Sequence, residues 1–474
     1  MKKAWRAPRD LELALATGDH EEHGAVVGRI AHRPLVDHIP VLPQECAWPQ
    51  QGNELGEGVH LRTISHEIAG VEHRSSAERR IACRLMTQLH ITPLSADLSN
   101  WRTAPHNRWA FRNVREIIPC AVVEAAGDAV SPLPAAPRSL DAFSLPVTGG
   151  RYLGLADFLR ATATDAFLIL HEGRIAHEFY DHGNGPHMPH IIMSATKSVT
   201  GLVAGLLQHD GILDVEAPVS RYVPEIANTA YGTTTVRHLL DMRTSVRLDD
   251  EAQQAYDAAT NWSPSPVGRS PVGLHRFFES LAATESGHGG PFRYVSANTD
   301  LLGWVLERAA GRSFASLLSA LLWKPMGAEN DAYITLDCEG APRCTGGLCT
   351  TVRDLARLGQ LIVDGGRNGS RQVVPRAWIA DVESNGDREA WRSGEFAASF
   401  GRREMSYRSG WYAVHDAPGI LFAMGIHGQN LFIDRANRLV IAKMSSQANP
   451  IDADAVALTH MAVAEIRRCV LGQA

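Results

Sequence analysis

Lysine is the scarcest charged residue in this 474-residue chain, which has five lysines among 46 basic residues. Acidic residues number 52, the formal net charge is −6, and the arginines are scattered along the sequence. The sequence therefore lacks a basic cluster that could follow a nucleic-acid backbone or hold the protein on a membrane surface. We expect neither nucleic acid nor a membrane as a partner.

Long apolar runs are also lacking, since no stretch of about 18 apolar residues could form a membrane-spanning helix. The N-terminal MKKAWRAPRD has the charge of an export signal, but LELALATGDHEEHG follows where an apolar segment should stand. Seven cysteines are spread out, odd in number and without a C-x-x-C pair, which is typical of reduced thiols rather than of disulfides or a zinc site. We therefore expect a cytoplasmic protein.

Residues 1–85 differ from the rest of the chain. They hold seven of the 21 histidines, several clusters of proline, glycine and glutamine, and no sustained period of 2 or 3.6 residues. We interpret them as a poorly ordered N-terminal extension, or as sequence upstream of an alternative start at Met86. The histidines of HEEH (20–23) and of HMPH (187–190) lack the H-E-x-x-H order of a metal site, and we expect them to be solvated.

Strand patterns lie towards both ends of the remaining chain, with helical patterns between them. AFLILHEGRIAHEFY (166–180) predicts a hairpin, and GIHGQNLFIDRANRLVIAKMSS predicts another with its turn near 434–438. A terminal helix is expected at 452–471. We predict an α+β fold in which an antiparallel sheet, built from both chain ends, is flanked by helices and carries an inserted helical lobe at about 216–330.

HIIMSATKSVTGLVAGLLQHDG (190–211) places Ser194 three residues before Lys197 at the start of an apolar helix. Residues i and i+3 share a helix face, so hydroxyl and amine come within hydrogen-bond reach. The helix dipole favours an oxyanion near Ser194, and burial lowers the pKa of Lys197 towards that of a usable base. A chance S-x-x-K pair is the alternative, although a surface position in this chain would carry arginine.

FRYVSANTDLLGWVLE places Tyr294 before a helix that we expect Asn298 to cap. To act as a base at neutral pH, the hydroxyl would need its pKa lowered from its usual value near 10, which a Lys197 cation would do in a dry site. Core packing is the alternative for a lone tyrosine.

In AMGIHGQNLFID, Gly425 and Gly428 let backbone N–H groups approach a substrate, with a β-bulge as the alternative.

The order of three motifs resembles that of the serine β-lactamase and DD-peptidase superfamily. These motifs are the S-x-x-K segment, Tyr294 in YVS and the glycine-bearing strand. The blocks APHNRWAF, MSATKS, YVSANTD, GGLCTTVRDLARLG and GIHGQNLFID are most similar to those of 6-aminohexanoate-dimer hydrolases and family VIII carboxylesterases. The resemblance covers about Trp101 to the C-terminus. It implies that residues 99–474 form a serine hydrolase domain with the β-lactamase/DD-peptidase-like α+β fold.

The resemblance also implies roles for individual residues. Ser194 would be the nucleophile, activated by Lys197 and Tyr294, and the backbone N–H groups of Ser194 and Ile426 would form the oxyanion hole. The residues implied around the substrate are Trp411, Asp257, His427 and Ser296, the last standing where other members carry asparagine. The implied activity is acyl-enzyme hydrolysis of a small amide or ester without metal or organic cofactor, and a homodimer is the assembly we consider.

Two alternatives stay open on the same fold. A β-lactamase or DD-peptidase is disfavoured because no export signal is recognised and because Ala423-Met424-Gly425 stands where those enzymes carry a Lys-Thr-Gly type triplet. A non-catalytic penicillin-binding-like sensor would be marked by the loss of Ser194, Lys197 or Tyr294, and all three are present.

The stretch before Trp262 differs from the pattern of the dimer hydrolases. The resemblance implies a tyrosine and an aspartate there, which help to protonate the leaving amine and hold its ammonium group. MRTSVRLDDEAQQAYDAATNW (242–262) is several residues shorter, and although Asp257 matches the aspartate, Tyr256 is only an open alternative for the tyrosine. We therefore expect ester cleavage to exceed cleavage of the 6-aminohexanoate dimer.

Overall fold

The computed structural model describes residues 96–265, 268, 270–283, 287–401, 403–416 and 419–472, which all belong to one compact unit. The predicted N-terminal extension at 1–85 and the HEEH segment lie outside these residues. Five of the seven cysteines are described as free thiols.

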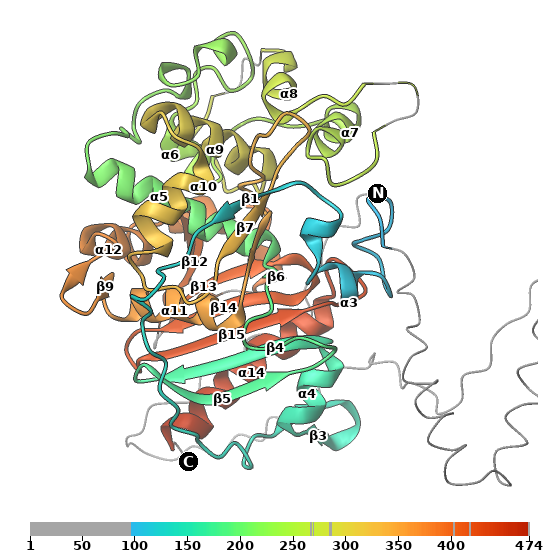
Figure 1. Cartoon of the computed structure of the whole chain (residues 1–474), viewed down its shortest axis with the longest axis vertical. Helices are drawn as coiled ribbons and strands as arrows, with labels where there is room; N and C mark the ends of the chain where they lie inside the picture. Colours follow the sequence, from blue (N-terminus) through green and yellow to red (C-terminus); the bar gives the residue numbers. More distant parts are fainter. Residues whose placement is uncertain are drawn as a thin grey trace, which may run out of the picture. The chain divides into compact units, whose positions relative to one another are not determined.

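Seven strands of the described chain form the main sheet, in the spatial order β11-β12-β13-β14-β15-β4-β5 (Figure 1). All neighbours are antiparallel, and the early strand β4 pairs with the late strand β15, so the sheet joins both ends of the domain. Both predicted hairpins are confirmed, as β4–β5 and β14–β15. The strands are Thr164–His171 (β4), Arg174–Tyr180 (β5), Met405–Arg408 (β11), Trp411–Val414 (β12), Ile420–Gly425 (β13), Gln429–Asp434 (β14) and Leu439–Ser445 (β15).

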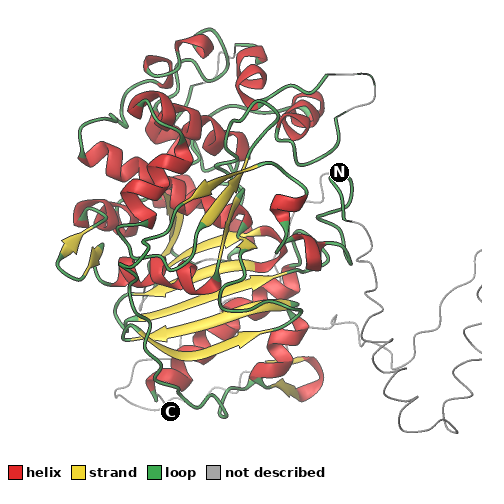
Figure 2. Ribbon diagram, viewed as in Figure 1, coloured by secondary structure: helices red, strands yellow, loops and turns green. Residues whose placement is uncertain are grey.

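The main sheet divides its side chains between two cores, because successive residues of a strand point to opposite faces. In β4, Leu168 and Leu170 belong to the core that contains helices α5 and α11, whereas Phe167 and Ile169 belong to the core that contains α14. Figure 2 shows the helices on the two sides of the sheet. These helices are Leu155–Ala161 (α4), Thr196–His209 (α5), Val352–Val363 (α11) and Ala453–Leu471 (α14), the last confirming the predicted terminal helix.

A smaller antiparallel sheet has the order β1-β7-β8-β6 in the described chain, and β6 leads directly into the turn that carries Ser194. Between β6 and β7 the described residues form helices and turns with no named strand. The predicted α+β architecture with an inserted helical lobe is thus confirmed. The elements are Cys120–Val123 (β1), His190–Ile191 (β6), Ala332–Thr335 (β7), Leu348–Thr350 (β8), Val236–Leu240 (α6), Asp250–Ala259 (α7), Leu274–Ser280 (α8), Ser296–Ala310 (α9) and Phe314–Leu318 (α10).

Helix α5 is packed on all sides, and its residues from Thr196 to Leu207 are all buried. A β-carbon on Gly201 would lie 1.9 Å from the carbonyl oxygen of Ser409, and one on Gly205 would lie 2.4 Å from the Trp378 ring. The small residues of the helix therefore let its neighbours touch the helix backbone. They also leave Lys197 inside the protein, with 2% of its surface exposed.

Two local predictions are wrong. Asn298 does not cap α9, because the helix begins at Ser296 and the buried Asn298 side chain accepts hydrogen bonds from Tyr231 and Thr244 instead. His190 is fully buried rather than solvated, and its Nε2 lies 3.3 Å from the Asp165 carboxylate. In both cases a distant segment supplies the partner.

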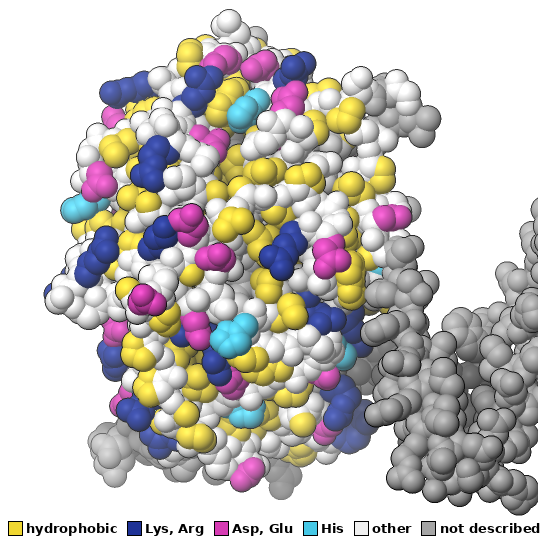
Figure 3. All heavy atoms as spheres, viewed as in Figure 1, with side chains coloured by type: hydrophobic (Ala, Val, Ile, Leu, Met, Phe, Trp, Pro, Cys, Tyr) yellow, Lys and Arg dark blue, Asp and Glu magenta, His cyan; other side chains and the backbone are white. Residues whose placement is uncertain are grey.

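The remaining short elements complete the surface of the domain. On the face shown in Figure 3, basic and acidic side chains are interspersed. Among the described residues, no helix combines the length and hydrophobicity needed to cross a membrane. These short elements are Asn107–Ala110 (α3), Leu145–Val147 (β2), Arg151–Leu153 (β3), Arg367–Asn368 (β9), Arg371–Gln372 (β10), Arg376–Ser384 (α12) and Arg388–Arg392 (α13).

Candidate active site

Ser194 lies in a single 3-10 turn, Met193–Ala195, between β6 and α5. The residue before it, Met193, has a φ of +47°, in the left-handed region that a non-glycine residue rarely adopts. Met193 is held there by burial in a small core that also contains Trp101 and Phe111. Such strain persists where the surrounding packing fixes it, and here it turns the chain sharply at the serine.

Lys197 lies one helical turn beyond Ser194, as the spacing predicted. Its Nζ lies 3.0 Å from Oγ of Ser194 and donates a hydrogen bond, also 3.0 Å long, to the carbonyl oxygen of Thr345. Burial, and next the positive charge of Arg343, lower the pKa of Lys197 well below its usual value of 10.5. The amine is therefore suited to accept the Ser194 proton.

Tyr294 stands just before α9, with its ring centroid 4.7 Å from Nζ of Lys197. Burial raises the pKa of its hydroxyl above the usual value, although a hydrogen bond with Ser194 and the charge of Arg343 act in the other direction. The predicted lowering of this pKa is thus wrong, because burial disfavours the phenolate more strongly than the neighbouring groups stabilise it. Tyr294 keeps its proton and is suited to donate it.

The end of β13 runs against the Ser194 turn. A β-carbon on Gly425 would lie 2.5 Å from the carbonyl oxygen of Ile192 and 3.0 Å from the backbone nitrogen of Ser194, so only glycine permits this approach. Ile426 follows directly and lines the same cavities as Ser194. The two backbone segments predicted to form the oxyanion hole are therefore brought together.

A buried charge network behind Lys197 was not predicted. Asp300 on α9 forms an ion pair with Arg343, and its other oxygen accepts a hydrogen bond of 2.8 Å from the backbone N–H of Thr345. Tyr256 donates to the same carboxylate at 2.6 Å. The network fixes the loop whose carbonyl holds Lys197. The acid Asp300 inside the apolar helix segment TDLLGWV was the available signal, of the same kind as the lysine in the apolar helix α5.

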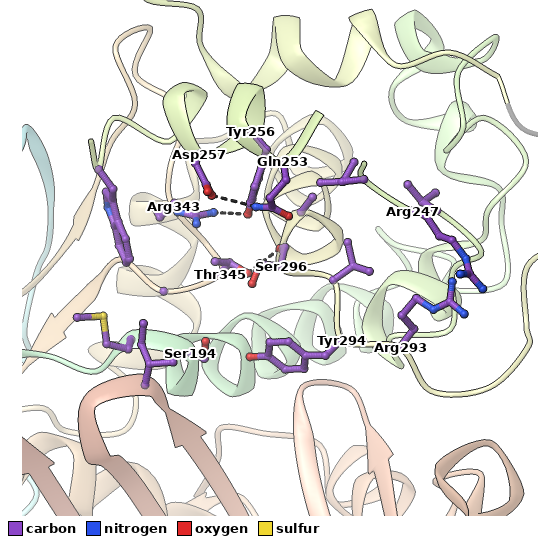
Figure 4. Close-up of a pocket in the computed structure, with 18 of the residues that line it drawn as sticks. Ser194, Arg247, Gln253, Tyr256, Asp257, Arg293, Tyr294, Ser296, Arg343 and Thr345 are labelled. Carbon is purple, nitrogen blue, oxygen red and sulfur yellow. Dashed lines mark hydrogen bonds between the residues drawn. The ribbon is translucent and has the colours of Figure 1, made fainter. Parts of the chain in front are cut away.

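A cavity lies above Ser194 and Tyr294, and Figure 4 shows the residues around it. Its volume is about 480 Å³, which is the size of a small-molecule site. We call it the arginine-lined cavity, because Arg102, Arg247, Arg293 and Arg343 all line it. Asp257 and Ser296, two of the residues predicted around the substrate, line it as well.

A second cavity, which we call the apolar cavity, meets the first at Ser194, Tyr294 and Ile426. Residues of β12, β13, β14 and α14 line it, together with residues of loops and 3-10 turns. The residues that line this cavity but not the arginine-lined cavity are Phe396, Phe400, Tyr412, Met424, Gly425, Gly428, Asn430, Gln447, Pro450, Ile451, Ala455, Val456 and Thr459.

Two residues predicted around the substrate are placed elsewhere. Trp411 is fully buried in the core beside α5, because the alternation along β12 turns Trp411 to that face and Tyr412 to the apolar cavity. His427 is fully buried too, with Nδ1 2.7 Å from the carbonyl oxygen of Gln447 and its ring against Phe111. Neither residue lines the arginine-lined cavity or the apolar cavity, so both expectations are corrected.

Comparison with known proteins agrees with this geometry. A sequence model of the beta-lactamase family matches residues 156–466, which is more than half of the chain. The chain belongs to the β-lactamase family. The match spans the Ser194 turn, Tyr294 and the β13 strand, and the predicted superfamily is confirmed.

Two named hydrolases illustrate the sequence similarity of this β-lactamase-family chain to other proteins. The 6-aminohexanoate-dimer hydrolase of Paenarthrobacter ureafaciens is 36% identical over 359 residues, covering 74% of this chain and 88% of that protein. Esterase EstB of Burkholderia gladioli is 27% identical over 156 residues, covering 31% of this chain and 39% of the esterase. Among solved structures, a candidate 6-aminohexanoate-dimer hydrolase from Bacillus anthracis has a TM-score of 0.73 and 26% identity, covering 79% of this chain and 97% of that one.

These relationships establish the reaction class. The chain is an acyl-enzyme serine hydrolase that cleaves an amide or ester.

Proposed function

We propose that Ser194 is the nucleophile of this hydrolase and that Lys197 is its general base. The proposal rests on the 3.0 Å distance between Nζ and Oγ at a buried lysine whose pKa is lowered. Lys197 takes the hydroxyl proton as Oγ bonds to the substrate carbonyl carbon, and the backbone N–H groups of Ser194 and Ile426 stabilise the resulting oxyanion.

Tyr294 then protonates the leaving amine or alcohol as its bond to carbon breaks, and the proton on Lys197 restores the tyrosine. Water repeats the sequence on the acyl-enzyme, giving up a proton to the same pair while Ser194 regains its own. The raised pKa of Tyr294 supports the role of donor rather than initial base. No step in this scheme uses a metal or organic cofactor.

The substrate we propose is a small amide or ester of the kind cleaved by carboxylesterases or by 6-aminohexanoate-dimer hydrolases. β-Lactams are less suited because Ala423-Met424-Gly425 offers no cation to their carboxylate at the end of β13. A non-catalytic sensor is disfavoured by the intact contact between Ser194 and Lys197. A cytoplasmic location and a homodimer remain parts of the proposal, the first supported by the free thiols.

A fluorophosphonate probe tests the nucleophile directly. It should add one phosphonyl group at Ser194, as located by mass spectrometry of digested protein. Ser194→Ala should abolish labelling and lower kcat on a short-chain ester by at least about 10³. Full activity in this variant would refute the assignment, and parallel assays with the 6-aminohexanoate dimer and nitrocefin would rank the substrate classes.

A further inference from the structure

The two cavities at Ser194 differ in chemistry. They share Ser194, Tyr294 and Ile426, so a substrate whose carbonyl carbon is attacked by Ser194 can extend into both. The groups on the two sides of the scissile bond would then meet different surroundings. A site of this kind selects molecules whose two halves differ in polarity.

The arginine-lined cavity has an excess of positive charge, since four arginines line it against the two carboxylates of Asp257 and Glu395. Two of the arginines already have carboxylate partners: Arg343 pairs with Asp300, and Nε of Arg293 lies 3.4 Å from Glu395. Arg247 is exposed and forms no ion pair with a described residue. In Figure 4 its guanidinium and that of Arg293 point toward one another at the Tyr294 end of the cavity.

Asp257 does not offset this charge on its own. Its carboxylate accepts a hydrogen bond of 3.0 Å from Gln253 and lies near enough to Arg102 to favour the charge of that guanidinium. An ammonium group on the substrate would therefore meet four guanidinium groups, which repel it, against the two lining carboxylates of Asp257 and Glu395. A carboxylate would meet the opposite balance, and a guanidinium binds a planar carboxylate through two parallel hydrogen bonds.

The apolar cavity offers the other half of the substrate no charge. Neither a carboxylate nor a lysine or arginine occurs among its described lining residues, which include Phe396, Tyr412 and Met424. Tyr294 itself stacks on Phe396 with ring centroids 5.3 Å apart. An alkyl or aryl group buried there gains free energy in proportion to its apolar area.

We propose that the substrate is an amide or ester that carries an apolar group on one side of the scissile carbonyl and a carboxylate on the other. The inference rests on the proposed function of Ser194 and adds the substrate class to it. The carboxylate binds between Arg247 and Arg293, and the apolar group fills the apolar cavity. Such molecules include N-acyl amino acids and half-esters of dicarboxylic acids, which place the carboxylate on the leaving group and on the acyl group, respectively.

Two matched ester series test the proposal in both orientations. The first compares 4-(hexanoyloxy)butanoate with its neutral carboxamide. The second compares monohexyl glutarate with its carboxamide and with the cationic hexyl 5-aminopentanoate. We expect kcat/KM for the carboxylate to exceed that of the matched carboxamide by about tenfold or more in at least one series, with the ammonium ester the poorest substrate. Carboxamides that equal or exceed carboxylates in both series would overturn the proposal.

Substitutions test whether Arg247 and Arg293 cause the preference for a carboxylate over a carboxamide. Arg247→Ala and Arg293→Ala should each lower the carboxylate-to-carboxamide ratio, whereas the exposed Arg371→Ala on β10 is the matched control and should leave the ratio unchanged. On the other side, Val456→Asp should lower the preference for a hexyl over an ethyl ester. A ratio that falls equally in Arg371→Ala would show a general charge effect and overturn the assigned site.

The neutral carboxamides separate this proposal from the proposed function. If they are hydrolysed and Ser194 is labelled by the fluorophosphonate, the hydrolase assignment stands whatever the charge preference. If no ester is hydrolysed and Ser194 is not labelled, the proposed function itself fails.

Discussion

Asp300 accepts a hydrogen bond from the backbone N–H of Thr345, which lies 45 positions later in the chain, with 2.8 Å between the nitrogen and the carboxylate oxygen. The carbonyl of Thr345 in turn accepts a hydrogen bond from Lys197. A carboxylate outside the lining of the described cavities thus positions the proposed base. Its ion pair with Arg343 is almost fully buried, with 7% and 0% of the arginine and aspartate side chains exposed.

Asp300→Asn should destabilise the protein strongly. The substitution leaves the Arg343 charge buried without its carboxylate, which typically costs about 3–5 kcal/mol of unfolding free energy. Urea denaturation of wild type and variant measures the difference. Asp157→Asn is the matched control, because its ion pair with Arg160 is exposed and should contribute less than about 1 kcal/mol. Equal losses in the two variants would contradict the account.

Lys197→Arg should be nearly inactive although it keeps a basic side chain. Arginine does not lose its proton in proteins, and its planar head does not fit a site built for an amine beside the Tyr294 ring. We expect kcat on a short-chain ester to fall to less than about a tenth of the wild-type value. Circular dichroism and thermal unfolding serve as controls for folding. A variant that keeps more activity would show that Lys197 acts only as a cation.

The pH profile of kcat/KM should report the proton of Lys197. Protonated lysine cannot accept from Ser194, so the rate should rise with pH as the amine deprotonates. Because burial and the charge of Arg343 lower this pKa, the rise should be complete well below pH 10.5. Initial rates on a neutral ester across pH measure the midpoint.

Arg343→Gln should move that midpoint to higher pH. It removes a positive charge near Lys197 and leaves the Asp300 carboxylate without its ion-pair partner, and both changes stabilise the protonated amine. We expect a displacement of roughly one pH unit or less, because burial is the larger cause. Arg343→Lys keeps the charge and should displace the midpoint less. A midpoint that stays in place or moves to lower pH in Arg343→Gln would refute the coupling.

Short-chain esters should be better substrates than the 6-aminohexanoate dimer by at least about 10² in kcat/KM. An amine must be protonated as it leaves, whereas an alkoxide or phenoxide leaves more readily. The one tyrosine available in the shortened stretch, Tyr256, is 2% exposed and its hydroxyl is engaged with Asp300 and Arg343. Comparable values on the two substrates would show that the shortened stretch still supports amide cleavage.

The sequence alone determined the parts of the site that depend on short spacings. Ser194 and Lys197 are three residues apart on one helix, so their contact follows from helix geometry. The two hairpins and the terminal helix follow from apolar periodicity within a few residues. Gly425 marks the close approach of β13 because only a missing side chain permits it.

The contacts between distant segments depend on the packing of the folded chain. Neighbouring residues of β12 point to opposite faces of the sheet. Which face borders the apolar cavity depends on the elements that pack against the sheet, and for this reason Tyr412 rather than Trp411 lines that cavity. Whether the pKa of Tyr294 is raised or lowered depends on the balance between burial and the neighbouring groups. This balance cannot be predicted from the spacing of residues in the sequence. Asp300, Arg343 and Thr345 meet through packing of α9 against a loop more than 40 positions away, because buried charges must find partners wherever the fold places them.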